Sequence, residues 1–178
     1  MDDREIVAVQ IGRPSRAKTT TVNRCHLGLP VVVRVPPVLE DGTPFPTLYW
    51  LTCPLAVRRV SRIESNGGVK EMDRRADQDP EFRAALGKAH LRYARRRDAL
   101  LPEGTEPKPK GGVAGTGSRV KCLHAHYADT LAGNINPVGD LVAPRVEPLD
   151  CPVPCVITSG PGFSRNPDWV KPDWVEPR

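Results

Sequence analysis

The sequence has no run of the roughly 20 apolar residues that a membrane helix needs, so it predicts no membrane-spanning segment. Its first five residues lack the basic start and the apolar centre of a secretory signal. It also lacks the two glycine-rich phosphate loops of nucleotide-binding proteins, Gly-x-x-x-x-Gly-Lys-Ser/Thr and Gly-x-Gly-x-x-Gly after a strand. We therefore expect a cytoplasmic protein with no membrane anchor and no standard nucleotide site.

Aromatic residues make up only 5% of the 178 residues, and the five cysteines include no Cys-x-x-Cys pair. An odd number of cysteines in a cytoplasmic protein argues against a disulfide framework, so the thiols are expected to be reduced. The 20 prolines imply that part of the chain lies outside the core. This length and composition predict one domain of ordinary size with a tail.

The net charge is only +5, and much of it falls in residues 92–97 of a predicted helix. A solvated helix face explains these arginines as well as a phosphate-binding surface does. Nucleic acid is therefore not expected as a partner.

Three β-branched or aromatic runs, residues 19–23, 31–35 and 47–51, predict strands. Their connections are too short for helical crossovers, so the sheet should be antiparallel. Residues 2–12 fit a short helix or a strand, and we favour the helix. Three of the nine aromatic residues, Phe45, Tyr49 and Trp50, occur around the third strand, where we expect them to anchor the core.

Helical periodicity follows this region. Helices are predicted for residues 54–66, 69–78, 79–101 and 119–132, with a flexible glycine-rich loop at 102–117 and a turn at 134–140. We therefore predict an α+β fold, in which a small antiparallel sheet packs against three or four helices in a domain of residues 1–142. Residues 143–178 form a Pro-rich tail, expected to be extended or disordered.

Soft metal ligands gather near strand ends, helix starts and the glycine-rich loop. The site hypothesis is a zinc ion or an iron-sulfur cluster bound by Cys25, Cys53, Cys122 and His124, which requires the sheet edge to meet the fourth helix. The spacing matches no known motif. These cysteines can equally be small hydrophobic residues of the core.

Two further interpretations involve the same residue types. Cys122, near a helix start and beside Lys121, could be a nucleophile with His124 or His126 as its base. The Cys151-Pro-Val-Pro-Cys155 segment could clip the tail or bind metal, although no nearby histidine completes a ligand set. His90 lies on the apolar side of its helix, which indicates packing.

Four blocks of sequence resemble a known family. They are Asp41-Gly-Thr-Pro-Phe-Pro-Thr-Leu-Tyr-Trp-Leu-Thr-Cys-Pro54, Ser61-Arg-Ile-Glu64 followed by Gly68, Arg119-Val-Lys-Cys-Leu-His-Ala125, and Asn136-Pro-Val-Gly-Asp140. Together they resemble the bacterial domain-of-unknown-function family 501 over roughly residues 3–142. The resemblance implies no activity, cofactor or partner.

Two positions bear on the metal hypothesis through this resemblance. Some members of that family carry histidine at the position of Cys53, an exchange that suits a metal ligand. A histidine of the family's fourth helix is replaced here by Asp129, and His126 is additional.

The sequence thus predicts a protein of unknown activity with a Cys/His site at a sheet-helix junction. The alternatives are an interaction module, whose arginine-bearing helices and Trp-Pro tail contact a protein or an acidic polymer, and a cysteine-nucleophile enzyme.

Overall fold

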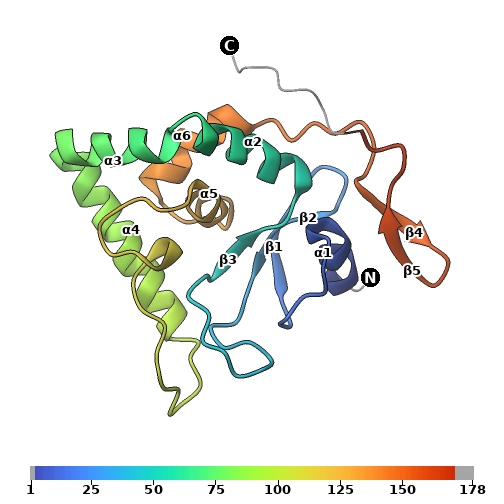
Figure 1. Cartoon of the computed structure of the whole chain (residues 1–178), viewed down its shortest axis with the longest axis horizontal. Coiled ribbons are helices and arrows are strands. Elements are labelled where there is room, and N and C mark those ends of the chain that lie inside the picture. The colour runs from blue at the N-terminus through green and yellow to red at the C-terminus, as the bar shows by residue number, and fades with distance from the viewer. Residues whose placement is uncertain (1–2, 171–178) are drawn as a thin grey trace.

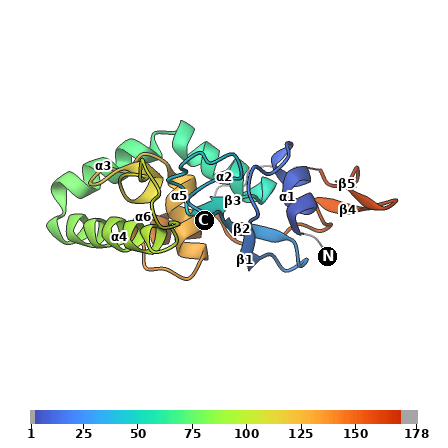
Figure 2. The same ribbon diagram turned by 90° about the horizontal axis from the view of Figure 1, so that it is seen from below.

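A three-stranded antiparallel sheet lies between one N-terminal helix and a larger group of helices (Figures 1 and 2). The computed structural model describes residues 3–170. Helix α1 (Asp3–Ile11) covers one side of the sheet, and the other side faces the remaining helices. The predicted α+β fold is confirmed, and residues 3–11 form the favoured helix.

The sheet contains β1 (Thr20–Arg24), β2 (Pro30–Arg34) and β3 (Tyr49–Leu51), in the order β1-β2-β3. All three strands are antiparallel to their neighbours, as predicted from the short connections. Val31, Val32 and Val33 of the central strand are fully buried, because helices cover both faces of β2.

Three of the predicted helices are present almost as expected: α2 (Pro54–Ser65), α3 (Gly68–Gln78) and α4 (Pro80–Asp98). Gly67 takes a φ of 88° between α2 and α3, a conformation that suits glycine. The Asp79 side chain accepts hydrogen bonds from the amides of Glu81 and Phe82 and so caps α4.

One arginine of α4, Arg97, is less exposed than the sequence suggested, whereas Arg95 and Arg96 are exposed. Arg97 is buried and donates hydrogen bonds to the carbonyls of Pro109 (2.9 Å) and Gly111 (2.7 Å). The glycine-rich loop is therefore tied to α4, and it also contains a short 3-10 helix, η1 (Val113–Gly115). The predicted solvated face is wrong for Arg97, because loop carbonyls and the Asp98 carboxylate bind its guanidinium group.

Helix α5 (Leu123–Leu131) begins later than predicted. The expected start at Arg119 is wrong, because Cys122 is the N-cap residue and has an extended backbone. The amide of Val120 instead donates to the Asp73 carboxylate at 2.9 Å. This late start places Cys122 at the entrance to the helix rather than on one of its faces.

The sequence analysis also missed helix α6 (Pro137–Val146), in which Asn136 is the N-cap residue and Pro137 occupies the first turn. The expected turn at 134–140 is only the beginning of this helix. The predicted domain boundary after residue 142 therefore falls within a helix.

The C-terminal segment, expected to be extended or disordered, contains a hairpin of β4 (Val156–Ser159) and β5 (Gly162–Arg165). The hairpin packs on α1 at the far end of the molecule from α3 and α4 (Figure 1). Val156 and Trp169 are buried, because a few apolar residues between the prolines reach the core. The second Pro-Asp-Trp-Val sequence begins beyond the described residues.

Candidate functional site

A pocket of about 470 Å³ lies between β3 and the start of α5. Its wall is largely aromatic and aliphatic, and its polar residues come from the segment that enters α5. The lining residues are Phe45, Pro46, Thr47, Tyr49, Trp50, Leu51, Val57, Ala114, Lys121, Cys122, His124 and Ala125. All three aromatic residues that were predicted to anchor the core line this pocket; Tyr49 is buried, whereas Phe45 and Trp50 are half-buried.

Three potential ligands meet at the edge of this pocket. Cys122 is the N-cap residue of α5, His124 lies in its first turn, and Glu64 lies in the last turn of α2. The Glu64 carboxylate accepts a hydrogen bond from the amide of Leu123 at 2.6 Å, which ties the end of α2 to the start of α5. Two helices therefore hold the three side chains together.

The distances among these side chains are short. His124 Nδ1 lies 3.2 Å from Glu64 Oε1 and 3.8 Å from Cys122 Sγ. The other ring nitrogen, Nε2, lies 3.2 Å from the carbonyl of Val57 and 3.1 Å from Ser61 Oγ. Because a carbonyl only accepts, Nε2 donates to Val57 and Nδ1 faces the two acidic groups.

The pKa of His124 is raised to about 8. Burial by itself lowers this pKa, but the hydrogen bond with Cys122 and the negative charge of Glu64 outweigh it. Without a metal the ring is therefore mostly protonated at neutral pH, and a metal ion has to displace the Nδ1 proton.

The spacing fits a metal ion. The ligand atoms of Glu64, Cys122 and His124 all lie within 4.8 Å of one another, and residues 3–170 contain no other such set of three. A tetrahedral zinc separates neighbouring nitrogen and oxygen donors by about 3.4 Å, and nitrogen and sulfur donors by about 3.6 Å. The separations of 3.2 and 3.8 Å are close to these values.

The four ligands expected from the sequence do not converge. Cys122 and His124 come together, as predicted, but their third neighbour is Glu64, a residue that the sequence analysis quoted without assigning it a role. Cys53 is buried at the start of α2, and Cys25 lies in the turn between β1 and β2. Glu64 could not be found from spacing, because it joins the site only through the contact of α2 with α5.

The other cysteines form a second group. Burial raises the pKa of Cys53 to about 12, with smaller contributions from Cys155 and Cys151. Burial also raises the pKa of Cys155, with contributions from Cys151 and Cys25. Cys155 is therefore coupled electrostatically to Cys53, Cys151 and Cys25, and Cys53 is also coupled to Cys151.

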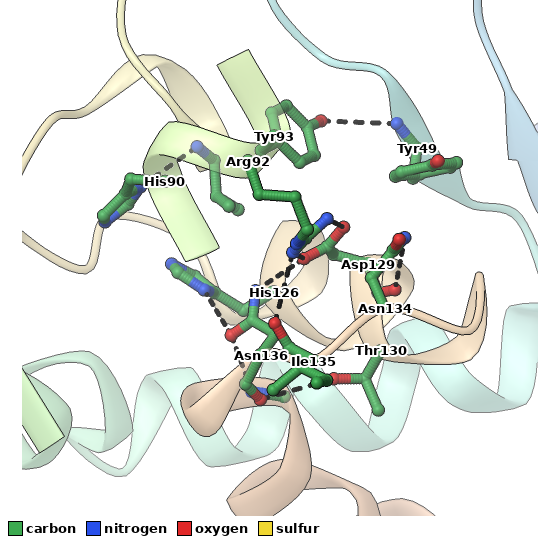
Figure 3. Close-up of polar contacts among 12 residues, drawn as sticks. Tyr49, His90, Arg92, Tyr93, His126, Asp129, Thr130, Asn134, Ile135 and Asn136 are labelled. Atoms are coloured by element: carbon green, nitrogen blue, oxygen red, sulfur yellow. Dashed lines mark hydrogen bonds and ion pairs between the residues drawn. The ribbon is translucent and has the colours of Figure 1, made fainter. Parts of the chain in front are cut away.

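His90 and His126 belong to a buried polar network between α4, α5 and α6 (Figure 3). Asp129 is fully buried and pairs with Arg92 at 2.5 Å, and Asn136 donates to the same carboxylate at 2.9 Å. His126 Nδ1 lies 3.0 Å from the side-chain oxygen of Asn136. The ring that contacts the Cys122 thiol is therefore that of His124 and not that of His126.

His90 and His126 face each other in this network, with ring centroids 5.6 Å apart. His90 Nδ1 accepts from the amide of Val113 at 3.1 Å, so its Nε2 carries the proton, and the Nε2 atoms of both rings have no hydrogen-bond partner. His90 is a packing residue, as predicted, although only one of its nitrogens is satisfied.

A family model described as a protein of unknown function (DUF501) matches residues 21–144. The match includes Glu64, Cys122 and His124 and ends before Cys151. No curated protein and no solved structure matches the chain. No helix in residues 3–170 combines the length and the apolar character needed to cross a membrane.

Proposed function

The chain belongs to the DUF501 family of unknown function, and we propose that it is a zinc-binding protein whose metal ligands are Glu64, Cys122 and His124. The proposal keeps two of the ligands expected from the sequence and replaces Cys25 and Cys53 by a carboxylate. Nitrogen, sulfur and carboxylate donors are all ordinary ligands of zinc.

The observation that carries this proposal is the orientation of His124. Its Nε2 donates to the carbonyl of Val57, which directs Nδ1 toward Cys122 and Glu64. Metal-bound histidines almost always donate their second nitrogen to a carbonyl or carboxylate in this way. Glu64 is held in turn by the amide of Leu123.

Three protein ligands leave one coordination position open, as in catalytic rather than structural zinc sites. Cys122 and His124 both line the pocket, so the open position faces it. Zinc bound there supplies a Lewis acid and a water of lowered pKa. Phe45 and Trp50 provide an apolar wall for a substrate, and Lys121 provides a positive charge at the same pocket.

The test is the metal content of protein purified without chelator or affinity metal. We expect about one equivalent of zinc per chain, measured by elemental analysis, and its loss in Cys122→Ser and His124→Gln. His26→Gln, at an exposed histidine outside the site, is the control and should retain zinc.

A zinc content under about a tenth of an equivalent in the unaltered protein contradicts the proposal. In that case selective alkylation of Cys122 by iodoacetamide would favour the cysteine-nucleophile alternative, because Cys122 lies at a helix N-terminus 3.8 Å from His124.

A further inference from the structure

Four cysteines come from three segments that contact one another near the start of β2. Cys25 comes from the turn between β1 and β2, Cys53 from the junction of β3 and α2, and Cys151 and Cys155 from the segment before the hairpin. Cys53 and Cys155 are buried and the other two are half-buried. The fold, rather than any sequence motif, brings them together.

Hydrogen bonds link these segments. Gln10 donates from Nε2 to the carbonyl of Pro30 at 2.9 Å and to Cys155 Sγ at 3.8 Å. Thr52, next to Cys53, donates to the same Pro30 carbonyl at 3.4 Å. The segments that carry Cys53 and Cys155 therefore approach the same residue, the first of β2.

Cys25 and Cys151 are linked in the same way. The ring of His26, next to Cys25, lies with Nε2 3.1 Å from the carbonyl of Cys151. The amide of Cys25 donates to the carbonyl of Leu29 at 3.0 Å, so the turn returns the chain to β2 beside this contact.

N–H groups point at three of the four sulfur atoms. Trp169 Nε1 donates to Cys151 Sγ at 3.4 Å, and Gln10 donates to Cys155 Sγ. The amides of Leu55 and Ala56 favour the charged form of Cys53, although neither makes a full capping hydrogen bond. Such donors stabilise thiolates and tune the potential of iron-sulfur clusters.

Four thiolates can bind a single zinc ion or an iron-sulfur cluster, and a single zinc ion requires the shorter sulfur–sulfur distances. Around a single zinc ion, neighbouring sulfur atoms lie about 3.8 Å apart. No three of these four sulfurs lie within 4.8 Å of one another. An iron-sulfur cluster holds its thiolates farther apart, because several iron and sulfide atoms lie between them.

We propose that Cys25, Cys53, Cys151 and Cys155 are the ligands of an iron-sulfur cluster. The cluster joins the C-terminal segment to the sheet and has two half-buried ligands on its solvent side. This site is separate from the Glu64–Cys122–His124 site, and neither proposal depends on the other.

The test is anaerobic purification of the full chain, with reconstitution by ferrous iron and sulfide where needed. We expect iron and acid-labile sulfide in equal amounts, about two or about four of each per chain, with visible charge-transfer absorption. Cys151→Ser and Cys155→Ser should lose at least about nine tenths of this iron, because a cluster needs its four thiolates.

Cys122→Ser is the matched control, because it removes a half-buried thiol from the other site. It should lose zinc and keep iron, whereas Cys151→Ser should keep zinc and lose iron. Circular dichroism checks that each variant is folded. Because Cys151 is half-buried and Cys155 is buried, Cys151→Ser should disturb the fold less than Cys155→Ser. The proposal would be overturned if the unaltered protein contained no iron, or if Cys151→Ser lost one equivalent of zinc. It would also be overturned if Cys122→Ser and Cys151→Ser contained equal amounts of iron.

Discussion

His126 and His90 illustrate, at the scale of single residues, how burial decides what a side chain can do. Burial lowers the pKa of His126 to about 4, although the ring donates a hydrogen bond to the side-chain oxygen of Asn136 that opposes this shift. Burial also lowers the pKa of His90, while Asp129 and the Arg119 carbonyl oppose it. Both rings are therefore neutral at neutral pH, which suits packing and not general acid catalysis.

This pair predicts a pH dependence of stability. In the unfolded chain His126 takes up a proton near its ordinary pKa of about 6.5, whereas in the folded protein it does so only near pH 4. The free energy of unfolding should therefore fall as the pH drops from about 6.5 towards 4, by on the order of 2–3 kcal/mol. Urea unfolding at a series of pH values measures this.

The variant His126→Gln should show a flatter profile over that range, because glutamine does not titrate. His26→Gln changes an exposed histidine and should leave the profile as it was. A steep profile that persists unchanged in His126→Gln would mean that other groups cause the acid instability.

At the scale of elements, two helices begin with the same chemistry in different surroundings. Asp79 caps α4 at a partly exposed position, through the amides of Glu81 and Phe82. Asn136 caps α6 through the amides of Val138 and Gly139, but it is also fully buried in the network of Figure 3.

We expect the two caps to differ in their effect on stability. Asp79→Ala removes only capping hydrogen bonds and should reduce the free energy of unfolding by about 1 kcal/mol. Asn136→Ala also removes a buried donor to Asp129 and the acceptor of His126 Nδ1, so the loss should be about 3 kcal/mol or more. Chemical denaturation compares them, and equal losses would show that the network adds little.

At the scale of the whole molecule, the C-terminal segment is part of the fold. The hairpin of β4 and β5 contacts α1, which in turn covers the sheet. Val156 is buried in the main core, whereas Thr158 is exposed on the same strand. The segment therefore covers α1 on the side of the molecule opposite to α3 and α4.

Val156→Asp should release this segment, because it places an uncompensated charge in the core. We expect limited proteolysis within residues 147–165 to be faster by on the order of tenfold, since cleavage follows the population of locally opened chain. The helical circular dichroism of the rest should persist. Thr158→Asp introduces the same charge at an exposed position and should be cleaved at the rate of the unaltered protein. Faster cleavage of both variants would contradict the prediction, because it would show that burial of Val156 does not hold the segment in place.

The sequence by itself determined the elements that depend on local periodicity and short connections. The antiparallel sheet, α2, α3 and α4 follow from alternating or helical spacing and from glycine and proline at their ends. Asn136-Pro137 carried the capping signal of α6, but the adjacent glycine and aspartate were interpreted as a turn. Cys122 and His124 were candidate ligands because soft ligands gather there, beside the glycine-rich loop and near a helix start.

Only the tertiary structure decided which side chains complete each site. Glu64 reaches Cys122 and His124 because α2 packs beside the start of α5. Cys25 and Cys53 separate from that pair and lie near Cys151 and Cys155, because the C-terminal segment returns to the beginning of β2. Such contacts join residues that are far apart in the chain. They depend on the packing of whole elements, which is stabilised by the burial of apolar surface and is not encoded in any local sequence pattern.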